Sequence, residues 1–338
     1  MKKHLNIPIF IPHLGCPNGC VFCNQKKISG HAGFSRGDVK KELDAAFTTV
    51  TGEIPAQIAY FGGSFTGIDR EDMLFLLETA KTYIDAGKCD SVRISTRPDY
   101  IDEEILSLLK RYGVKTIELG IQSMDEEVLL ASKRGHTAAD TERAAALIKA
   151  FGFEFVGQMM TGLPASTKEK EIETAKRICE MGADGARIYP TVVFRDTVLS
   201  EMAEQGAYVP FTEENAIERT AAVLSVFLVR GVPVIRIGLQ ATELLTSGAE
   251  TTGGGYHPAL GELVYSRCFR DALEKELITK QTSGKYAEIF VYPADLSKMI
   301  GQKGTNRDYL QTRFSLRGIR FIPSEMTAKN GFSVTLID

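Results

Sequence analysis

Residues 13–24, HLGCPNGCVFCN, place three cysteines within eight positions: Cys16, Cys20 and Cys23. The spacing is C-x3-C-x2-C, and no fourth cysteine follows nearby. Three thiolates this close together can hold one metal cluster. Cluster proteins that only carry electrons usually close the site with four cysteines. A cluster held by three cysteines keeps one iron open to an outside ligand, so this stretch indicates chemistry at that iron.

Two plainer explanations compete with an iron–sulfur cluster. A structural zinc site needs four closed ligands, and His13 could supply the fourth, three residues before Cys16. The three cysteines could also be clustered by chance. The remaining cysteines, Cys89, Cys179 and Cys268, lie far apart in the sequence, and we interpret them as ordinary small hydrophobes.

Composition sets the scale of the protein. The chain has 338 residues, 43% of them hydrophobic, which is enough for one large domain and a small one. The formal net charge is −3, but residues 283–338 hold eight Lys/Arg against five Asp/Glu. This mildly basic tail fits an anionic partner or a solvated surface. No signal peptide, membrane span or disulfide pattern is visible, so we expect a cytoplasmic protein with no membrane partner.

Strand and helix patterns alternate along most of the chain. Such alternation favours an α/β fold with a parallel sheet and outer helices, and six units would make an open, partial barrel. Active residues should then lie at the carboxyl ends of the strands. The predicted strands are 6–12, 57–61, 91–95, 116–121, 153–160, 185–189 and 234–237. The predicted helices are 35–49, 69–86, 102–111, 137–151, 166–181, 211–230 and 258–277.

Local signals refine the boundaries. Ser35, Thr137 and Ser166 are predicted helix N-caps, each with an acidic residue three positions later. Residues 246–255 are rich in Gly and Thr, which indicates a boundary or mobile loop. The predicted domains are a barrel at 1–245, a Gly-rich loop with a connecting helix at 246–283, and a small α+β domain at 284–338.

The cysteine stretch resembles the signature of the radical S-adenosylmethionine (SAM) superfamily, C-x3-C-x-aromatic-C, with Phe22 as the aromatic residue. The resemblance implies a (β/α)6 partial barrel and a [4Fe–4S] cluster on Cys16, Cys20 and Cys23. It also implies that SAM chelates the open iron and is reductively cleaved to a 5′-deoxyadenosyl radical. An electron donor such as flavodoxin or ferredoxin would then be a partner.

Further motifs resemble the Elongator catalytic-subunit family and the oxygen-independent coproporphyrinogen oxidases. They are YFGGSFTG, VRISTRPDYI, IELGIQSMDEEVLLASKRGHT, FVGQMMTGLPAST and ARIYPTVVF. By this resemblance Gly62, Gly63 and Ser64 would contact the methionine amino group of SAM. Its ribose would face Ser95, Gln122, Ser123 and Gln158, and Arg134 would pair with its carboxylate, which suits a guanidinium fork.

Some of these residues also have structural interpretations. Gly62-Gly63 fits a tight turn, and Arg97 could form an ion pair instead of contacting substrate. Arg134 could be a solvated charge at a helix end, and for His136 we favour a turn-capping role. Met159 and Met160 could wall the adenine, although most such methionines are core residues. Tyr189 would lie near the barrel mouth.

The tail, residues 286–322, follows the pattern strand, short helix, glycine loop, helix, strand. Its loop is Gly301-Gln302-Lys303-Gly304, and Arg307 follows. A G-x-x-G loop between two helices is the core of a KH module, in which the loop clamps single-stranded nucleic acid. A helix-ending glycine turn in a small α+β cap is the alternative.

Together these features predict a radical SAM enzyme that modifies RNA, with tRNA as the preferred substrate. The Elongator family has an acetyltransferase domain, which we expect this chain to be too short to contain, and a longer gap between its first two cysteines. One rival hypothesis is a radical SAM enzyme acting on a small, tetrapyrrole-like molecule. The other is a non-catalytic, cluster-containing RNA-binding protein.

Overall fold

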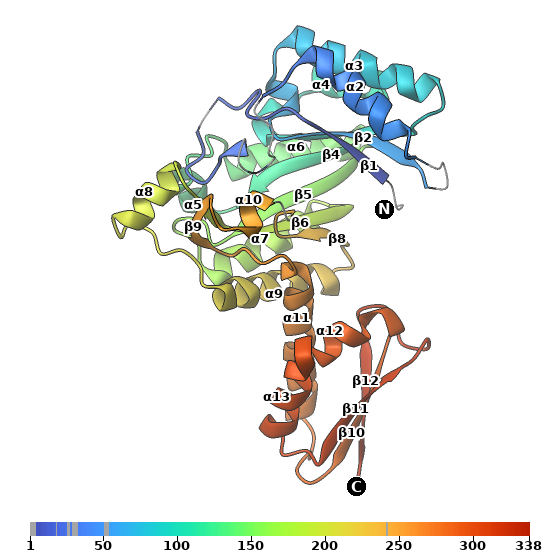
Figure 1. The fold of residues 1–338 in the computed structure, drawn as a ribbon, viewed down its shortest axis with the longest axis vertical. Coiled ribbons are helices and arrows are strands. Elements are labelled where there is room, and N and C mark those ends of the chain that lie inside the picture. The colour runs from blue at the N-terminus through green and yellow to red at the C-terminus, as the bar shows by residue number, and fades with distance from the viewer. Residues whose placement is uncertain (1–4, 18, 26–27, 29–32, 51–53, 241–242) are drawn as a thin grey trace.

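The computed structural model describes the whole chain except residues 1–4, 18, 26–27, 29–32, 51–53 and 241–242 (Figure 1). Seven parallel strands form the main sheet in the order β1-β2-β3-β4-β5-β6-β8. They are β1 (Leu5–Phe10), β2 (Ala56–Phe61), β3 (Ser91–Thr96), β4 (Val114–Gln122), β5 (Glu154–Thr161), β6 (Gly185–Pro190) and β8 (Val234–Ile237). The predicted parallel α/β sheet is confirmed.

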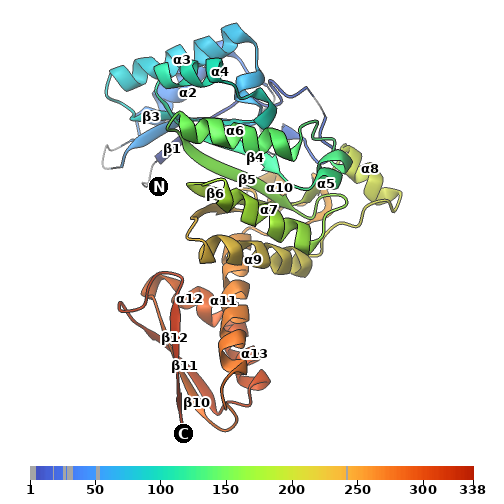
Figure 2. The same ribbon diagram turned by 180° about the vertical axis from the view of Figure 1, so that it is seen from behind.

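Helices cover one face of this sheet, as the reverse view shows (Figure 2). They are α2 (Arg36–Phe47), α3 (Arg70–Asp85), α4 (Glu103–Arg111), α6 (Ala138–Ala150), α7 (Lys168–Glu180) and α9 (Glu213–Val229). Side chains alternate along each strand. The apolar set, including Ile58, Ile94, Ile117, Phe155 and Ile188, is buried in the main core. The other set faces the opposite side of the sheet and carries most of its polar groups.

The sheet is curled into a partial barrel. The Arg187 guanidinium on β6 lies 5.5 Å from the ring centroid of Phe61 on β2, and it donates to Glu118 on β4. In a flat sheet β2 and β6 would lie four strand spacings apart, ~19 Å. The contact therefore requires the concave face to close toward itself, which confirms the predicted open barrel.

The helix caps follow the local signals with two exceptions. Thr137 and Asp140 form the predicted capping box. Ser35 occupies the N-cap of α2 but makes no side-chain cap. The predicted Ser166 cap of α7 is wrong: Thr167 caps that helix, because the Ser166 hydroxyl donates to Glu171 instead.

Elements that were not predicted include α5 (Glu126–Ala131), β7 (Val192–Phe194), α8 (Val198–Glu204), α10 (Glu243–Thr246) and, in the tail, β12 (Phe332–Ile337). The interpretation of 246–255 as a loop is partly wrong, because β9 (Thr251–Gly254) pairs antiparallel with β7. Gly254 has a φ of +102°, and an added Cβ would lie 2.5 Å from the Thr191 carbonyl oxygen. Glycine here lets the two backbones meet.

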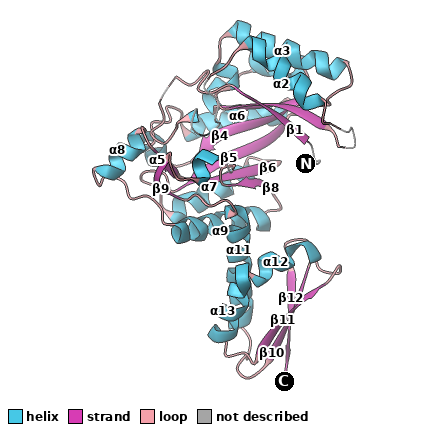
Figure 3. Cartoon of the chain, in the orientation of Figure 1, coloured by secondary structure: helices cyan, strands magenta, loops and turns pink. Residues whose placement is uncertain are grey.

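The tail is a three-stranded mixed sheet with helices on one face (Figure 3). It contains β10 (Tyr286–Val291), α12 (Leu296–Ile300), α13 (Thr305–Arg313), β11 (Gly318–Pro323) and β12 (Phe332–Ile337). The predicted order strand, helix, glycine loop, helix, strand is confirmed. The long helix α11 (Leu260–Ile278) places Leu260 and Val264 in the main core and Phe269, Leu273 and Leu277 in the tail core. Across the described residues, no helix combines the length and apolar character of a membrane span.

Candidate active site at the carboxyl ends of the strands

The cysteine loop follows β1, and backbone hydrogen bonds join it to the turn after β2. The Ser64 amide donates to the Leu14 carbonyl at 2.8 Å, and the His13 amide donates to the Gly62 carbonyl at 2.9 Å. A Cβ on Gly63 would lie 2.4 Å from the Leu14 oxygen. The Gly-Gly pair therefore has a structural role: it lets the cysteine loop pack directly on the neighbouring turn.

The three cysteines share this loop. Burial raises the pKa of the Cys16 thiol, and burial with the nearby Cys20 raises the pKa of Cys23 to about 12. Within the described part of the chain, no three metal-binding side chains converge closely enough to hold an ion. His13 Nε2 accepts a hydrogen bond from the Gln25 amide at 3.0 Å, which engages one of the two ring nitrogens that could bind zinc.

Arg134 connects the cysteine loop to the sheet. Its Nη1 donates to Cys20 Sγ at 3.2 Å, and its Nη2 donates to the Gly120 carbonyl of β4 at 2.6 Å. Only 7% of the side chain is exposed, so the interpretation of Arg134 as a solvated helix-end charge is wrong. The Arg134 guanidinium is therefore held between the carboxyl end of β4 and the cysteine loop.

Several buried polar atoms around Arg134 have no hydrogen-bond partner. They are Arg134 Nε, Gln122 Oε1, Ser132 Oγ and both ring nitrogens of His136. Buried polar groups in proteins are nearly always paired. Such a concentration of orphans beside three thiols is typical of a ligand site. Neither ring nitrogen of His136 makes a hydrogen bond of good geometry, although the ring lies within reach of the Ile121 backbone carbonyl, so the turn-capping role stays a prediction.

Three other candidate residues have side chains that hydrogen-bond to neighbouring residues of the chain. Ser64 Oγ lies 3.0 Å from Thr96 Oγ1 and accepts from the Arg97 amide at 3.2 Å, so its hydroxyl is used internally. Arg97 makes a two-pronged ion pair with Asp99, at 2.9 and 2.8 Å, which is the structural role left open above. Ser123 Oγ accepts from the Asp125 amide at 3.1 Å.

The remaining candidates lie on the concave face or next to the loop. Ser95 and Gln158 are partly exposed and face the concave side of β3 and β5. Phe22 is buried in a small apolar cluster with Val21 and Leu163. Met159 is fully buried in the main core, whereas Met160 is partly buried.

The pattern that defines the Radical SAM superfamily matches residues 10–178, and the Radical SAM C-terminal domain matches residues 183–270. The chain belongs to the radical SAM superfamily. It is 35% identical over 183 residues to the tRNA uridine(34) acetyltransferase of Methanocaldococcus jannaschii, covering 53% of this chain and 32% of that protein. It is 32% identical over 164 residues to Elongator complex protein 3 of Saccharomyces cerevisiae, covering 48% and 28%. The chain thus spans about a third of the length of these curated relatives.

Solved structures share the fold. The Elp3 of Methanocaldococcus infernus, lacking its N-terminus, superposes with a TM-score of 0.63 at 23% identity, over 82% of this chain and 64% of that one. The coproporphyrinogen III oxidase of Escherichia coli superposes with a TM-score of 0.50 at 17% identity, over 68% and 53%. At these identities the likeness shows the fold alone.

The residues of this radical SAM protein fit the groups that its superfamily implies. Three thiols in one loop supply the donor set of a three-cysteine cluster. The orphaned atoms of Gln122, Arg134 and His136 supply donors and acceptors for a polar ligand beside it. An acceptor on Gln122 suits a ribose hydroxyl, and a free Nε on Arg134 suits a carboxylate.

The sequence interpretation missed a charged network on the concave face. Glu118 Oε1 accepts from Arg93 Nη1 at 2.6 Å and from Arg187 Nη2 at 2.9 Å. Arg93 Nε also donates to Gln57 Oε1 at 2.9 Å. The signal was present: VRIS, IELG and ARIY each place a charge inside an otherwise apolar strand.

The tail loop is held in one conformation. Asn306 is 3% exposed, and its Nδ2 donates to the Ser266 carbonyl of α11 at 2.8 Å and the Met299 carbonyl at 3.2 Å. Gln302 and Lys303 are exposed. A Cβ on Gly301 would lie 2.8 Å from the Asn306 amide nitrogen, so the loop needs glycine there.

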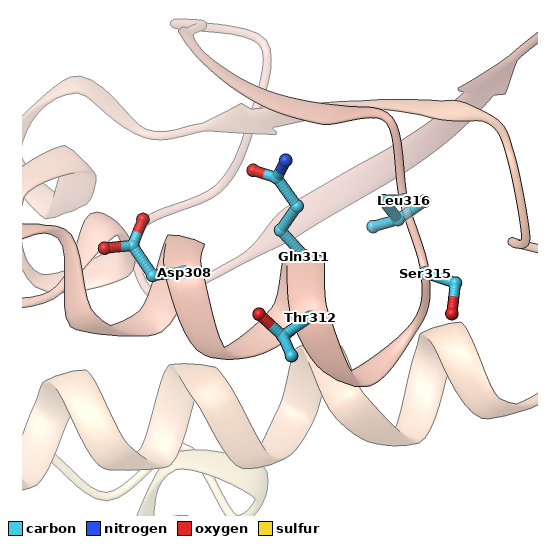
Figure 4. A pocket seen from close by; sticks show the side chains of 5 residues that line it. All are labelled: Asp308, Gln311, Thr312, Ser315 and Leu316. Carbon is cyan, nitrogen blue, oxygen red and sulfur yellow. The ribbon is translucent and has the colours of Figure 1, made fainter.

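Two surface pockets lie apart from the cysteines. One, of about 450 Å³, is formed by α13 and the turn after it and is lined by Asp308, Gln311, Thr312, Ser315 and Leu316 (Figure 4). Its lining carries a carboxylate and no cation, which disfavours phosphate. The other, of about 230 Å³, lies beside Gly162 and Arg219. Neither pocket is lined by a cysteine of the loop or by Gln122, Arg134 or His136.

Proposed function

We propose that this radical SAM enzyme modifies RNA, with tRNA as its preferred substrate. The matched relatives are named for action on tRNA uridine 34 or as Elongator subunits. The matches cover 53% and 48% of this chain but only 32% and 28% of those proteins, so they support the same class of substrate, and acetyl transfer is not part of the proposal.

Cys16, Cys20 and Cys23 would hold a [4Fe–4S] cluster, and Gln122 and Arg134 would orient SAM. When bound, the two groups supply radical chemistry, with an electron from a donor such as flavodoxin or ferredoxin. The chain contributes orientation and exclusion of water. Arg134 fixes Cys20 relative to β4, and the Ser64–Thr96–Arg97 bonds hold the adjoining turn.

The tail loop carries the RNA part of the proposal. The exposed Lys303 presents a positive charge between two glycines, and their missing side chains allow a phosphate to approach the backbone. Arg307 is half-exposed and follows on the first turn of α13, where it pairs with Asp308 at 2.9 Å. Because Asn306 anchors the loop to α11, little conformational entropy would be lost on binding.

The test is tRNA affinity at several salt concentrations for the full protein and a Lys303→Glu/Arg307→Glu variant. We expect the variant to bind more weakly, with a salt slope lower by roughly 1.4, since each phosphate contact on a single strand contributes about 0.7. Lys280→Glu/Lys275→Glu is the matched control. Lys275 lies in the last turn of α11, and Lys280 follows the C-cap residue Thr279. Lys280 is 14 residues beyond Ser266, the residue of α11 that anchors the loop, a separation of ~20 Å along a helix. Equal affinity and slope for loop variant and wild type would exclude the loop from RNA binding.

Catalysis needs its own measurement. The reconstituted enzyme with SAM and a reductant should release 5′-deoxyadenosine, and nucleoside analysis of tRNA from cells lacking the gene should show one altered nucleoside. Well-loaded protein that forms no 5′-deoxyadenosine would favour a non-catalytic RNA-binding role.

A further inference from the structure

The concave face of the barrel carries more positive charge than its carboxylates balance. Glu118 is shared by Arg93 and Arg187, at 2.6 and 2.9 Å. Arg236 on β8 is the register partner of Arg187 on β6, so both side chains lie on the same face. Among the described residues, Arg236 makes no ion pair. Glu154, the other acid on this face, is occupied with Thr116 at 2.9 Å.

Arg187 is the more buried of the two arginines, and one of its nitrogens makes no hydrogen bond of good geometry. Arg187 is 8% exposed. Its Nε lies 2.8 Å from Glu118 Oε2 but lacks the geometry of a hydrogen bond. Glu118 is the carboxylate of Arg187 and of Arg93 together, so the charge of the neighbouring Arg236 has no carboxylate of its own, and an anion would complete the site.

Arg187 and Arg236 lie on other strands than the end of β4 that Arg134 contacts. Gly120, which accepts from Arg134, is followed in register by Gln158 on β5, Arg187 on β6 and Arg236 on β8. At least one strand, β5, separates Gly120 from both arginines in the sheet. The single carboxylate of SAM is expected at Arg134, so an anion at Arg187 and Arg236 belongs to a second ligand.

The surroundings favour a nucleotide as that ligand. Phe61 and Tyr189 are partly exposed beside the arginines, and the Phe61 ring lies under Arg187. Aromatic faces stack unpaired bases, and guanidinium forks match phosphate. Tyr189 lies two residues after Arg187 on β6, so the two side chains lie on the same face of the sheet.

We propose that Arg187 and Arg236 bind a phosphate group of the RNA substrate inside the barrel, adjacent to the nucleotide that is modified. This assignment rests on the proposed function and sharpens it: the target nucleotide enters the concave face with its phosphate on β6 and β8. The tail loop would hold a different part of the same RNA.

Inorganic phosphate is the first probe, because it tests the site without RNA. We expect phosphate to raise the melting temperature of the cluster-loaded protein saturably, and Arg236→Gln to weaken its apparent affinity by roughly 10-fold or more. Arg236→Lys, which keeps the positive charge, should bind phosphate with an affinity between those of wild type and Arg236→Gln. Arg230→Gln, which removes a half-exposed arginine paired with Glu180 at 3.6 Å, is the matched control. Equal responses in Arg236→Gln and wild type, or equal stabilisation by acetate, would overturn the phosphate site.

tRNA is the second probe. Arg236→Gln should lower the salt slope of tRNA binding by about 0.7, the value for one phosphate contact on a single strand, and Arg230→Gln should leave it unchanged. An unaltered slope in Arg236→Gln would overturn the proposal. If tRNA does not bind at all, the proposed substrate fails, while the inorganic phosphate response still decides whether Arg187 and Arg236 form an anion site.

Discussion

Arg134 donates a hydrogen bond from Nη1 to Cys20 Sγ at 3.2 Å, across 114 positions of sequence. Its other terminal nitrogen is fixed to the Gly120 carbonyl of β4. One guanidinium thus sets the distance between the cysteine loop and the strand end that carries Gln122. The buried Nε has no partner, and it is a donor that a bound carboxylate can take.

This relationship predicts a selective defect in Arg134→Gln. Hydrogen bonds to charged groups contribute about 1.5–3 kcal/mol, so SAM affinity should fall roughly 10- to 150-fold. Arg134→Lys keeps the positive charge but lacks the planar guanidinium, so its SAM affinity should lie between those of wild type and Arg134→Gln. Equilibrium SAM binding and iron content are measured together. Arg143→Gln, an exposed arginine paired with Asp140, is the control. Unchanged SAM affinity in iron-replete Arg134→Gln would remove Arg134 from the SAM site.

The cysteine triad predicts a sharp division among the six cysteines. Replacing Cys16, Cys20 or Cys23 by alanine should abolish most iron binding after anaerobic reconstitution, because each removes one of three ligands. Cys179→Ala, at a partly buried and separate position, should bind as much iron as wild type. A full iron content in any of the three loop variants would rule out the assigned ligand set.

Gly63→Ala should disturb the cluster loop without touching a ligand. The new Cβ would lie 2.4 Å from the Leu14 oxygen and 2.6 Å from the Ile11 oxygen. Backbone must move to relieve this contact, so we expect a loss of about 1–3 kcal/mol in the free energy of unfolding together with reduced iron content.

Gly37→Ala is the matched control for that substitution. Gly37 lies on α2, and the nearest atom to its added Cβ is Ser35 Oγ at 3.7 Å. The change should be neutral or stabilise by up to about 1 kcal/mol. If both alanines behaved alike in urea unfolding and iron content, the steric argument for Gly63 would be wrong.

Sequence patterns predicted the strands of the parallel sheet because each strand has one apolar face, whereas the (β/α)6 barrel was implied by the family resemblance. Ile58, Ile94, Ile117 and Ile188 recur on the helix-covered side, so period and length identify the strands. The motifs also fall at the strand ends, as a parallel sheet requires. β9 escaped detection because its residues are glycine and threonine, and only its pairing with β7 defines it.

Contacts between distant segments could not be predicted in this way. Nothing local shows that the Ser64 hydroxyl is satisfied by Thr96, or that Arg187 reaches Glu118 across the curled sheet. Both depend on curvature, which a linear pattern does not encode. The pairing of Arg97 with Asp99 is local, and there the two interpretations could be stated in advance.

His136 predicts a specific pH dependence of stability. It is 4% exposed. Burial, followed by the positive charges of Arg134 and Arg97, lowers its pKa to about 4 from an ordinary value of 6.5. Between these values the unfolded chain binds a proton that the folded protein excludes. The free energy of unfolding therefore falls as the pH is lowered through this range, and the contribution lost between pH 7.5 and pH 5 is about 2 kcal/mol.

His136→Leu removes this titration while keeping an apolar side chain of similar size. Urea unfolding at intervals from pH 7.5 to pH 5 should give a shallower loss of stability in the variant than in the wild type, by about 2 kcal/mol over the range. The baseline stability of the variant can differ without affecting the test, because only the slope is compared. Two parallel curves would mean that His136 is not held neutral by its burial beside Arg134 and Arg97.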